Sequence, residues 1–361
     1  MEYKFDICID NIVFSLQRVG GISTYFGELI KRLLNSNSNV AFVEQEGVLH
    51  NVIRKEFTIS ANNVLTEKAI TPKLIRYLPI KINLTNKSIF HSSYYRICNS
   101  TNAVNIITVY DFNYEYGYVR SGIRKYIHCM QKKKAVEKAD GVICISKNTK
   151  QDLLKIYNKI DPDKIKVVYL AASDEFYPIT RTFGCPSKVI HLKSILEKKF
   201  ILFVGTRKQY KNFNVCIDTI SKLNEFYLVI VGAPLTNVET TILEARIPQK
   251  YYNLVDISAT ELNYLYNYAF CLMYPSSYEG FGIPLLEGMQ SGCPVLSTKA
   301  SSIPEVVGDA GLLVDTICAE AFIEQILKLE DTTFRNSIVN AGFEQSKKFS
   351  WDKTYKETVE Y

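Results

Sequence analysis

Apolar runs of strand length alternate with segments of helical periodicity along the whole chain. Continuous apolar strands separated by helices are typical of parallel sheets that helices cover on both faces. The runs that predict strands are KFDICID, SIFHSS, NIITVYD, GVICIS, IKVVYL, FILFVG, YLVIVG, NLVDIS, AFCLMYP, PVLST and GLLVD. The segments that predict helices include STYFGELIKRLLN, KNTKQDLLKIYN, FNVCIDTISKLN and TELNYLYNYA.

The alternation stops once, over residues 168–194. This segment contains no clear element and holds the breakers Pro178, Gly184 and Pro186. A chain of 361 residues is too long for one compact core and fits two domains. The pattern therefore predicts an α/β fold with two doubly wound, Rossmann-like domains, at 1–180 and 195–345. In such sheets ligands bind beyond the carboxyl ends of the strands, so the residues that follow each strand matter most.

The composition is that of an ordinary globular protein, with 47% hydrophobic and 22% charged residues. No apolar run approaches the roughly 20 residues that a membrane-spanning helix needs, and the first residues, MEYKFDICID, predict a strand. The nine cysteines are scattered and never form C-x-x-C, which is typical of buried thiols in a reducing compartment. We therefore expect a cytoplasmic protein.

The net charge of +6 has a local origin in residues 119–140. Apolar residues recur there at near-helical spacing among many lysines and arginines, which predicts a basic amphipathic helix. Two interpretations are open. The helix contacts anionic headgroups at the inner face of the plasma membrane, or it presents an ordinary solvated face. Nucleic acid is not an expected partner, because no binding motif accompanies the charge.

The first strand end with candidate chemistry lies in FILFVGTRKQYKNF. Arg207 and Lys211 follow the strand directly, on the loop that enters the next helix. Two cations beside a helix start favour an anion, because the helix dipole and the free N–H groups add to their charge. An arginine holds two phosphate oxygens in a fork, and a lysine supplies a movable point charge. A solvated basic turn is the alternative.

The second strand end lies in AFCLMYPSSYEGFGIPLLEGMQSGCPV. Glu279 precedes the Phe281-Gly282 turn, and Glu287 lies about one turn into the helix that begins near Pro284. Glycines let the backbone approach a ligand closely. Two carboxylates would repel a phosphate, but they accept hydrogen bonds from neutral hydroxyl groups. The pattern therefore predicts that the two acids bind sugars on either side of a diphosphate.

A third strand end carries Gly20-Gly21, in QRVGGISTYFGELI. We expect the backbone to approach a ligand there, and the following helix to be capped by Ser23 or Thr24. Neither G-x-G-x-x-G nor G-x-x-x-x-G-K-[ST] occurs in the chain. Their absence argues against a dinucleotide dehydrogenase and a P-loop kinase.

Taken together, these segments resemble the retaining glycosyltransferases of family 4, which have the GT-B fold of two domains facing across a cleft. The similarity is dense from about residue 200 to 315, and includes the E-x7-E element from Glu279 to Glu287. It is sparser in the first half and returns at the C-terminus. The stretches that carry it are RVGGIS, VGTRKQYKNF, SSYEGFGIPLLEGMQSGCPV, SSIPEVVGDAGLLVD and FSWDKTYKETVEY.

The resemblance implies a nucleotide-sugar donor in the C-terminal domain, an acceptor in the N-terminal domain, and chemistry without a metal or other cofactor. It implies that Arg207 and Lys211 hold the donor diphosphate, that Glu279 bonds the transferred sugar and that Glu287 bonds the ribose. Residues 346–361 are expected to form a helix that crosses back to the N-terminal domain. The implied donor-binding positions are Gly20, Gly21, Arg207, Lys211, Phe281, Gly282 and Glu287.

One departure concerns the strand NIITV, after which many family members carry His-Asp and this chain carries Tyr110-Asp111. A tyrosine bonds a sugar hydroxyl but does not take up a proton near neutral pH. In a front-face retaining mechanism the departing phosphate accepts the acceptor's proton instead. His91 is either a partial substitute or a buried, hydrogen-bonded histidine. The expected catalytic positions are Arg207, Lys211, Glu279, Tyr110 and Asp111.

Three further features are read structurally. Asp161-Pro162-Asp163 resembles a metal-binding Asp-x-Asp pair, but its place between a helix and a strand favours a turn. Ser146 is expected to cap a helix, with donor contact as the alternative. The aromatic segment 113–119 either stacks on an acceptor sugar, faces lipid, or packs as a surface loop.

The sequence thus predicts a hexosyltransferase that moves a sugar from a UDP- or GDP-sugar to a glycan or lipid-linked oligosaccharide. The closest resemblance is to bacterial enzymes of O-antigen or capsule synthesis. Two alternatives stay open: a sugar-nucleotide 2-epimerase of the same fold, and a scaffold that keeps the fold without catalysis.

Overall fold

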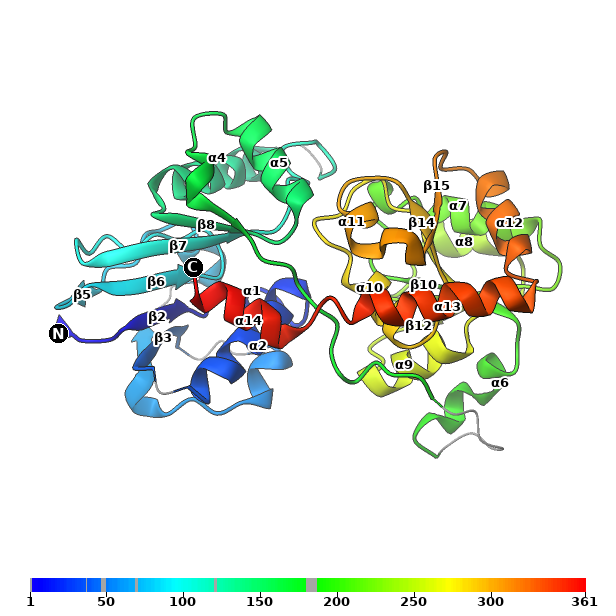
Figure 1. Ribbon diagram of the computed structural model, residues 1–361, viewed down its shortest axis with the longest axis horizontal. Coiled ribbons are helices and arrows are strands. Elements are labelled where there is room, and N and C mark those ends of the chain that lie inside the picture. The colour runs from blue at the N-terminus through cyan, green and yellow to red at the C-terminus, as the bar shows by residue number, and fades with distance from the viewer. Residues whose placement is uncertain (1, 37, 47–49, 69–70, 120–121, 180–186) are drawn as a thin grey trace. The chain divides into compact units, whose positions relative to one another are not determined.

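A computed structural model describes residues 2–36, 38–46, 50–68, 71–119, 122–179 and 187–361. The chain forms two compact units (Figure 1). The first contains residues 1–170 together with 351–361, and the second contains 171–350. The boundary between them falls within the 168–194 segment, of which residues 180–186 lie outside the described residues.

The first unit is built on a seven-stranded parallel sheet with the order β4-β3-β2-β6-β7-β8-β9. The chain starts in the middle of the sheet, winds to one edge, and then returns to build the other half, as a doubly wound sheet does. A separate two-stranded pair joins β1 to β5. The strands are β1 (Glu2–Tyr3), β2 (Ile7–Asp10), β3 (Val40–Gln45), β4 (Val64–Glu67), β5 (Asn83–Leu84), β6 (Ser88–Ser92), β7 (Ala103–Val109), β8 (Gly141–Cys144) and β9 (Ile165–Val167).

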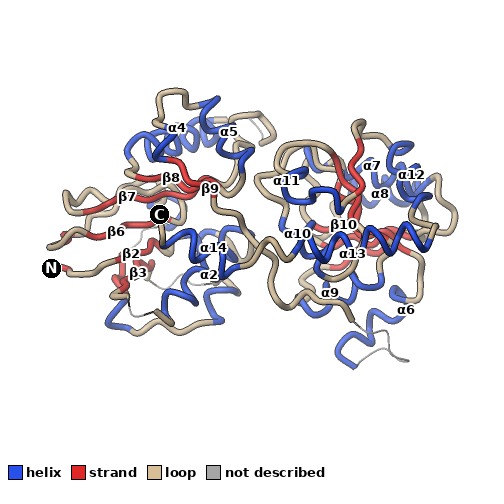
Figure 2. Tube along the Cα trace, in the orientation of Figure 1, coloured by secondary structure: helices blue, strands red, loops and turns tan. Residues whose placement is uncertain are grey.

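Helices cover both faces of this sheet (Figures 1 and 2). α2 and α14 pack together on one face, and α4 and α5 lie on the other. α14 is the last helix of the chain, so the C-terminal segment 351–361 belongs to the first unit. The helices are α1 (Val13–Leu16), α2 (Gly21–Leu34), α3 (Pro72–Ile75), α4 (Ile123–Lys138), α5 (Lys147–Ile156) and α14 (Trp351–Val359).

The second unit is built on a six-stranded parallel sheet with the order β12-β11-β10-β13-β14-β15. Here too the chain reverses its winding direction, between the neighbouring strands β10 and β13. Such a reversal opens a crevice at the carboxyl ends of the two strands, which is where ligands bind in this class of sheet. The strands are β10 (Phe200–Val204), β11 (Tyr227–Val231), β12 (Tyr251–Leu254), β13 (Cys271–Tyr274), β14 (Val295–Thr298) and β15 (Leu312–Val314).

The core of the second unit is aliphatic and aromatic and lies between the sheet and α7, α8 and α12. The strands at its centre are fully buried, which accounts for their continuous apolar sequences. The helices are α6 (Lys193–Leu196), α7 (Phe213–Ser221), α8 (Asn237–Arg246), α9 (Ala259–Tyr268), α10 (Ile283–Gln290), α11 (Ile303–Val307), α12 (Ala319–Lys328) and α13 (Thr332–Ser346).

The predicted fold class is confirmed, and every apolar run that predicted a strand contains or overlaps one, although NLVDIS shares only the last two residues of β12. Two strands of the first sheet escaped prediction, β3 and β4. β3 is entirely buried but ends in Glu44 and Gln45, and these polar residues interrupt the apolar pattern. β4 is an edge strand whose side chains are mostly half-exposed, so its sequence does not alternate clearly.

Candidate active site

The loops that follow β10 and β13 form one unit at the point where the second sheet reverses direction. Hydrogen bonds of Ser277 and Asn212 join them. The Ser277 N–H donates to the Tyr210 carbonyl at 2.8 Å, and the Asn212 amide donates to Pro275 O at 2.8 Å and to Ser277 Oγ at 2.7 Å. Asn212 has a φ of 49° and stands at the start of α7. The two predicted segments, far apart in sequence, are thus held side by side.

Lys211 lies at the centre of this joined structure, in the short 3-10 turn Gln209–Lys211. Its side chain is almost fully buried, and its Nζ donates to Glu279 Oε1 at 2.5 Å and to the Tyr274 hydroxyl at 2.6 Å. A buried ammonium group needs such partners, because leaving it unpaired in the interior is very costly. The lysine predicted to bind phosphate and the acid predicted to bind sugar are therefore direct partners in this structure.

Two serines after β14 fix the loop that carries Glu279. The Glu279 N–H donates to Ser301 Oγ at 2.7 Å. The Ser302 hydroxyl bonds the carbonyls of Glu279 at 2.9 Å and Phe281 at 3.0 Å. Gly282 then turns the chain into α10 with a φ of 102°, a conformation that side-chain-bearing residues rarely adopt. We call Ser301 and Ser302 the serine brace. It was not predicted, because hydroxyl groups at loop positions carry no pattern of their own.

Arg207 lies in the β10 loop with its side chain only 5% exposed. Its Nε donates to Glu239 Oε1 at 2.7 Å, and its Nη2 donates to the Pro234 carbonyl at 2.8 Å. The third nitrogen, Nη1, is buried and has no hydrogen-bond partner among the residues that the structure describes. A buried guanidinium N–H without an acceptor is unfavourable, so we expect this atom to bond an anionic ligand, and that role stays a prediction.

Glu239 was not predicted as a site residue, and it orients Arg207. It stands in the first turn of α8, where it forms a capping box with Thr236. Burial acts to raise the pKa of its carboxyl group, but hydrogen bonds from Arg207 and Thr236 outweigh that effect and lower the pKa to about 2. Glu239 is therefore ionised at every physiological pH. A T-x-x-E capping box was readable in the sequence, but its contact with Arg207 was not.

Gly232 is a second residue that sequence reasoning missed. It follows β11, next to β10 in the sheet. A Cβ atom there would lie 2.5 Å from the Gly205 carbonyl and 3.6 Å from Arg207 Nη1. Glycine thus lets the β11 loop pass close to the loop that carries Arg207. A glycine at the end of a buried strand was the available signal.

Glu287 lies on α10, one turn after Gly282. Burial raises the pKa of its carboxyl group to about 7, although the Tyr266 hydroxyl donates to Oε2 at 2.9 Å and acts in the opposite direction. No cation neutralises it among the contacts of the described residues. A carboxyl group with a pKa of about 7 and without a cationic partner suits a ligand that presents hydroxyl groups, because its ionised form accepts hydrogen bonds from them.

The site residues predicted in the first unit have different surroundings. Gly20 has extended backbone and forms the N-cap of α2 without any side-chain cap. The prediction that Ser23 or Thr24 caps this helix is wrong, because both hydroxyls bond back to the Gly20 carbonyl, at 2.8 and 3.3 Å. Gly21 is the first residue of the helix.

Tyr110 is buried within an aromatic cluster, with Tyr25 and Tyr95 at ring-centroid distances of 6.4 Å each. Its hydroxyl donates to the Ser93 carbonyl at 3.2 Å. The Asp111 carboxylate accepts the Asn113 N–H at 3.0 Å, and the Asp111 carbonyl accepts Lys132 Nζ at 2.8 Å. Both residues thus have structural partners, and a catalytic role for either of them stays a prediction.

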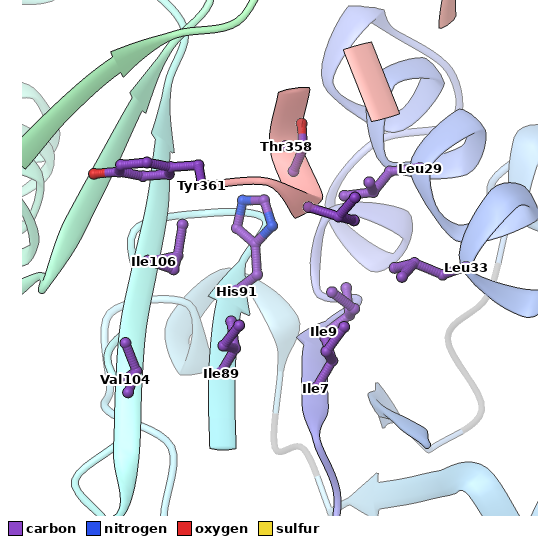
Figure 3. A pocket seen from close by; sticks show the side chains of 11 residues that line it. Ile7, Ile9, Leu29, Leu33, Ile89, His91, Val104, Ile106, Thr358 and Tyr361 are labelled. Atoms are coloured by element: carbon purple, nitrogen blue, oxygen red, sulfur yellow. The ribbon is translucent and has the colours of Figure 1, made fainter. Parts of the chain in front are cut away.

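Of the two interpretations of His91, the structure supports the buried, hydrogen-bonded histidine. It lies on β6 at the edge of an apolar cavity of about 120 Å³, between the sheet and α2 and α14 (Figure 3). Burial lowers the pKa of the imidazole to about 3, and Nε2 shares a hydrogen bond with Thr108 Oγ1 at 2.9 Å. A histidine that stays neutral and is bonded within the core does not replace the family's histidine as a proton acceptor.

Ser146 and the Asp161-Pro162-Asp163 turn have the structural roles that were predicted. The aromatic segment 113–119 packs against neighbouring residues. Ser146 caps α5 and accepts the Thr149 N–H. Asp161 caps a 3-10 turn at Pro162–Lys164, as a turn with a proline predicts. In the 113–119 segment, the Tyr114 ring packs against the His128 ring in a tilted arrangement with the centroids 4.2 Å apart, and the Tyr116 hydroxyl donates to Asp152 at 2.6 Å.

The predicted positions therefore divide between the units. Arg207, Lys211, Glu279, Phe281, Gly282 and Glu287 all belong to the second unit, around the β10 and β13 loops, while Gly20, Gly21, Tyr110 and Asp111 belong to the first. Within the part of the chain that the structure describes, no cluster of three His, Cys, Asp or Glu side chains is arranged to hold a metal ion.

Comparison with known families agrees with this division. A model described as "Glycosyltransferase Family 4" matches residues 19–175, and one described as "Glycosyl transferases group 1" matches residues 190–345. The chain belongs to the family 4 glycosyltransferases. The second match includes both loops of the candidate site, and the resemblance inferred from the motifs is confirmed.

Relatives of this glycosyltransferase include the O-antigen chain mannosyltransferase B of Escherichia coli, 28% identical over 62% of this chain and 61% of that protein. The O-antigen chain mannosyltransferase RfbU of Salmonella typhimurium is 27% identical over 75% of this chain and 74% of its own length. HepE of Anabaena, solved with UDP and glucose, superposes with a TM-score of 0.73 at 14% identity and covers 99% of this chain and 98% of that one. The last similarity establishes the GT-B fold.

Proposed function

We propose that this glycosyltransferase moves a hexose from a nucleotide-sugar to a glycan acceptor with retention of configuration at the anomeric carbon. The observation that carries the proposal is the buried Arg207 with an unpartnered Nη1, in the loop that also holds Lys211. Two cations at the switch point of the sheet fit a diphosphate. The carboxyl groups of Glu279 and Glu287 fit the hydroxyl groups of the two sugar rings that flank it.

In the proposed binding step, Lys211 and Glu279 exchange their mutual contact for contacts with the donor. A diphosphate brings acceptors for both Arg207 Nη1 and Lys211 Nζ. When Lys211 bonds the phosphate, it shares its charge between two anions, and Glu279 becomes available to the hydroxyl groups of the transferred sugar. The serine brace holds the Glu279 backbone while its side chain changes partner.

The reaction follows from where the charge develops. The bond from the anomeric carbon to the diphosphate oxygen breaks, and negative charge grows on the departing phosphate. Arg207, Lys211 and nearby N–H groups stabilise that charge in a water-poor site. The acceptor hydroxyl attacks from the same face, and its proton passes to the departing phosphate. This route needs no protein base, which agrees with the partners of Tyr110 and His91.

The relatives support the choice of sugar and pathway. Two are named as mannosyltransferases of the O-antigen chain, so we assign mannose as the transferred hexose and a surface polysaccharide as the product. HepE was solved with UDP, which supports a nucleoside diphosphate at this site. The acceptor is a glycan or lipid-linked oligosaccharide, and the enzyme works at the membrane face that carries it. No metal or other cofactor takes part in the proposed reaction.

The test begins with a thermal-shift screen of UDP, GDP and their glucose and mannose conjugates. We expect one base to raise the unfolding temperature clearly more than the other, and Arg207→Ala to abolish the increase. The preferred donor is then incubated with and without a glycan acceptor, and the product is analysed by NMR. Transfer with an unchanged anomeric configuration supports the proposal. Conversion of the sugar in the absence of acceptor would identify an epimerase, and no ligand-induced shift would contradict the site itself.

A further inference from the structure

α4 differs from an ordinary surface helix, because it exposes an apolar stripe along its first half and buries two polar side chains beside Ala135 and Val136. The face that packs on the first unit includes His128 and Lys132, and Lys132 is only 1% exposed. The opposite face presents Ile123, which is 77% exposed, and Tyr126, which is 66% exposed, together with Ile127 and Met130. A soluble helix normally buries its apolar stripe and exposes its lysines.

The buried polar residues explain why the helix has this orientation. Lys132 Nζ bonds the Asp111 carbonyl at 2.8 Å and Glu115 Oε2 at 2.9 Å, and lies 4.5 Å from the centroid of the Phe112 ring. The His128 ring packs against the Tyr114 ring in a tilted arrangement. Rotation of α4 to bury its apolar stripe would break these contacts and leave the Glu115 carboxylate without its cation. The exposed stripe is therefore a fixed feature of the fold.

The exposed residues of α4 form one continuous surface. Positions 123, 126, 127 and 130 have the i, i+3, i+4, i+7 spacing that places side chains on one face. The surface continues across a cavity of about 320 Å³, which Ile127 and Met130 share with Tyr77, Leu78 and Pro79 of the segment after α3. Leu78 is itself 58% exposed. We call this surface, with residues Leu78, Ile123, Tyr126, Ile127 and Met130, the α4 apolar face.

Basic residues surround the α4 apolar face. Glu137 is the only acidic residue of α4, and it lies 3.8 Å from Lys133. Lys134 and Lys138 line the cavity beside Ile127 and Met130. The solvent-accessible basic residues of the helix are Arg124, Lys125, Lys133, Lys134 and Lys138. Residues 120–121, which belong to the predicted basic segment, lie outside the described residues.

We propose that the α4 apolar face docks on an anionic lipid bilayer, with its apolar side chains among the upper acyl chains and its lysines at the headgroup phosphates. The combination of an apolar stripe with flanking lysines matches the two components of such a surface. A symmetric contact with a second copy would bring the same lysines together, and like charges oppose that arrangement. No helix of the described residues has the length and hydropathy to span a bilayer, so the contact is peripheral.

This surface supplies the membrane contact of the proposed transferase, and its test does not depend on sugar transfer. Full-length protein is sedimented with vesicles of phosphatidylcholine alone and with an equimolar mixture of phosphatidylcholine and phosphatidylglycerol. We expect binding to the anionic vesicles only. Because each basic residue at the surface contributes about a fivefold factor, Lys134→Ser with Lys138→Ser is expected to weaken binding roughly 25-fold. Ile127→Ser with Met130→Ser is expected to weaken it at least tenfold, roughly.

A matched control is available in the second unit. Leu327→Ser with Lys328→Ser removes one exposed apolar residue and one exposed lysine from α12, and vesicle binding should not change. All variants concern exposed side chains, so their unfolding temperatures should stay close to that of the unaltered protein. Donor hydrolysis should also be unchanged. If hydrolysis is absent from every protein while vesicle binding follows this pattern, the proposed function fails and the docking surface stands.

The depth of insertion gives an independent readout. Trp351 is the only tryptophan and is buried, so it supplies a constant background. In Tyr126→Trp, anionic vesicles should shift the emission to the blue, and lipids brominated in the upper acyl chain should quench it. Three results would overturn the proposal. They are no binding to anionic vesicles, unchanged binding of the Ile127 and Met130 variant, or a concentration-dependent dimer that this variant abolishes without any vesicle binding.

Discussion

Two buried arginines at the carboxyl edges of two similar sheets show how the same topology serves different purposes. Arg96, in the first unit, has a side chain with 0% exposure, and all three of its nitrogens have partners: Leu78 O, Asp10 Oδ1 and the Glu67 carboxylate. Arg207, in the second unit, has a side chain that is 5% exposed, and one of its nitrogens has no partner within the described part of the chain. Both side chains are buried, and both arginines follow the carboxyl end of a strand. They differ in the number of guanidinium nitrogens that have a hydrogen-bond acceptor.

This difference distinguishes a charged side chain that stabilises the fold from one that can bind a ligand. A fully bonded buried arginine ties strands together and offers nothing to a ligand, while one with an unsatisfied N–H gains from any anion that reaches it. The buried carboxyl groups of the two units, Asp10 and Glu287, also differ in their partners. Burial raises the pKa of Asp10 to about 6 even though Arg96 opposes the shift. Glu287 has a tyrosine hydroxyl rather than a cation as its hydrogen-bond partner in the described part of the chain, and burial raises its pKa to about 7.

The largest expected effect is on the structural arginine. Arg96→Met leaves Asp10 and Glu67 without their cation inside the first unit. Removal of one partner from a buried ion pair costs about 3–5 kcal/mol, so we expect a loss of stability of that size in urea unfolding. A change within about 1 kcal/mol, as is usual for surface substitutions, would contradict the structural role assigned to this arginine.

The second effect is on catalysis. Arg207→Ala and Lys211→Ala are each expected to lower turnover by about 10²–10³, because each removes a group that stabilises the departing phosphate. Arg207→Ala should preserve the fold, as judged by circular dichroism and urea unfolding. Arg246→Ala, which alters an exposed arginine of α8, is the control and should leave turnover unchanged. Unaltered turnover in both site variants would refute the site.

A smaller effect is expected at Glu239, which touches Arg207 but not the proposed donor. In Glu239→Gln the charged partner that orients Arg207 is lost, and we expect donor affinity to fall about tenfold, since a hydrogen bond to a charged group contributes about 1.5–3 kcal/mol. Glu239 has a pKa of about 2, so the difference from the unaltered protein should be the same at pH 6 and pH 8. A difference that appears only at one pH would argue against this role.

The smallest effect concerns the pH dependence of stability at Glu287. The pKa in the folded protein, about 7, exceeds the ordinary value of 4.5. Between these values the folded state keeps a proton that the unfolded chain has released, so this group's contribution to stability falls as pH rises to about 7 and is constant above it. Glu287→Gln lacks this loss. We expect it to be more stable by about 1–2 kcal/mol at pH 8, after allowance for partial exposure, and no more stable at pH 4.

Glu287→Gln also sharpens the functional assignment. An ionised carboxylate accepts two hydrogen bonds from a ribose diol, so donor affinity should rise as pH increases through about 7 and the variant should lose this dependence. Titration calorimetry with an intact nucleotide-sugar is the measurement, because its diphosphate is esterified at both ends and does not titrate in this range. Equal pH dependence in both proteins would speak against ribose binding by Glu287.

The sequence alone determined the alternation of strands and helices, the division into two doubly wound units, and the two loops that carry the site. These features depend on the spacing of apolar residues and on glycines and prolines, which act over a few neighbouring residues. Arg207, Lys211, Glu279 and Glu287 were predicted for the same reason, since each follows a strand whose end the pattern marks.

The tertiary structure decided which of these groups touch. The pairing of Lys211 with Glu279, the orientation of Arg207 by Glu239, and the close passage at Gly232 all join loops that only the strand order brings together. It also decided that α4 turns its apolar stripe to the solvent, which its periodicity alone could not show. Periodicity defines the faces of an element, whereas the partners available in the assembled fold, here Glu115 and Tyr114 for α4, select the face that is buried.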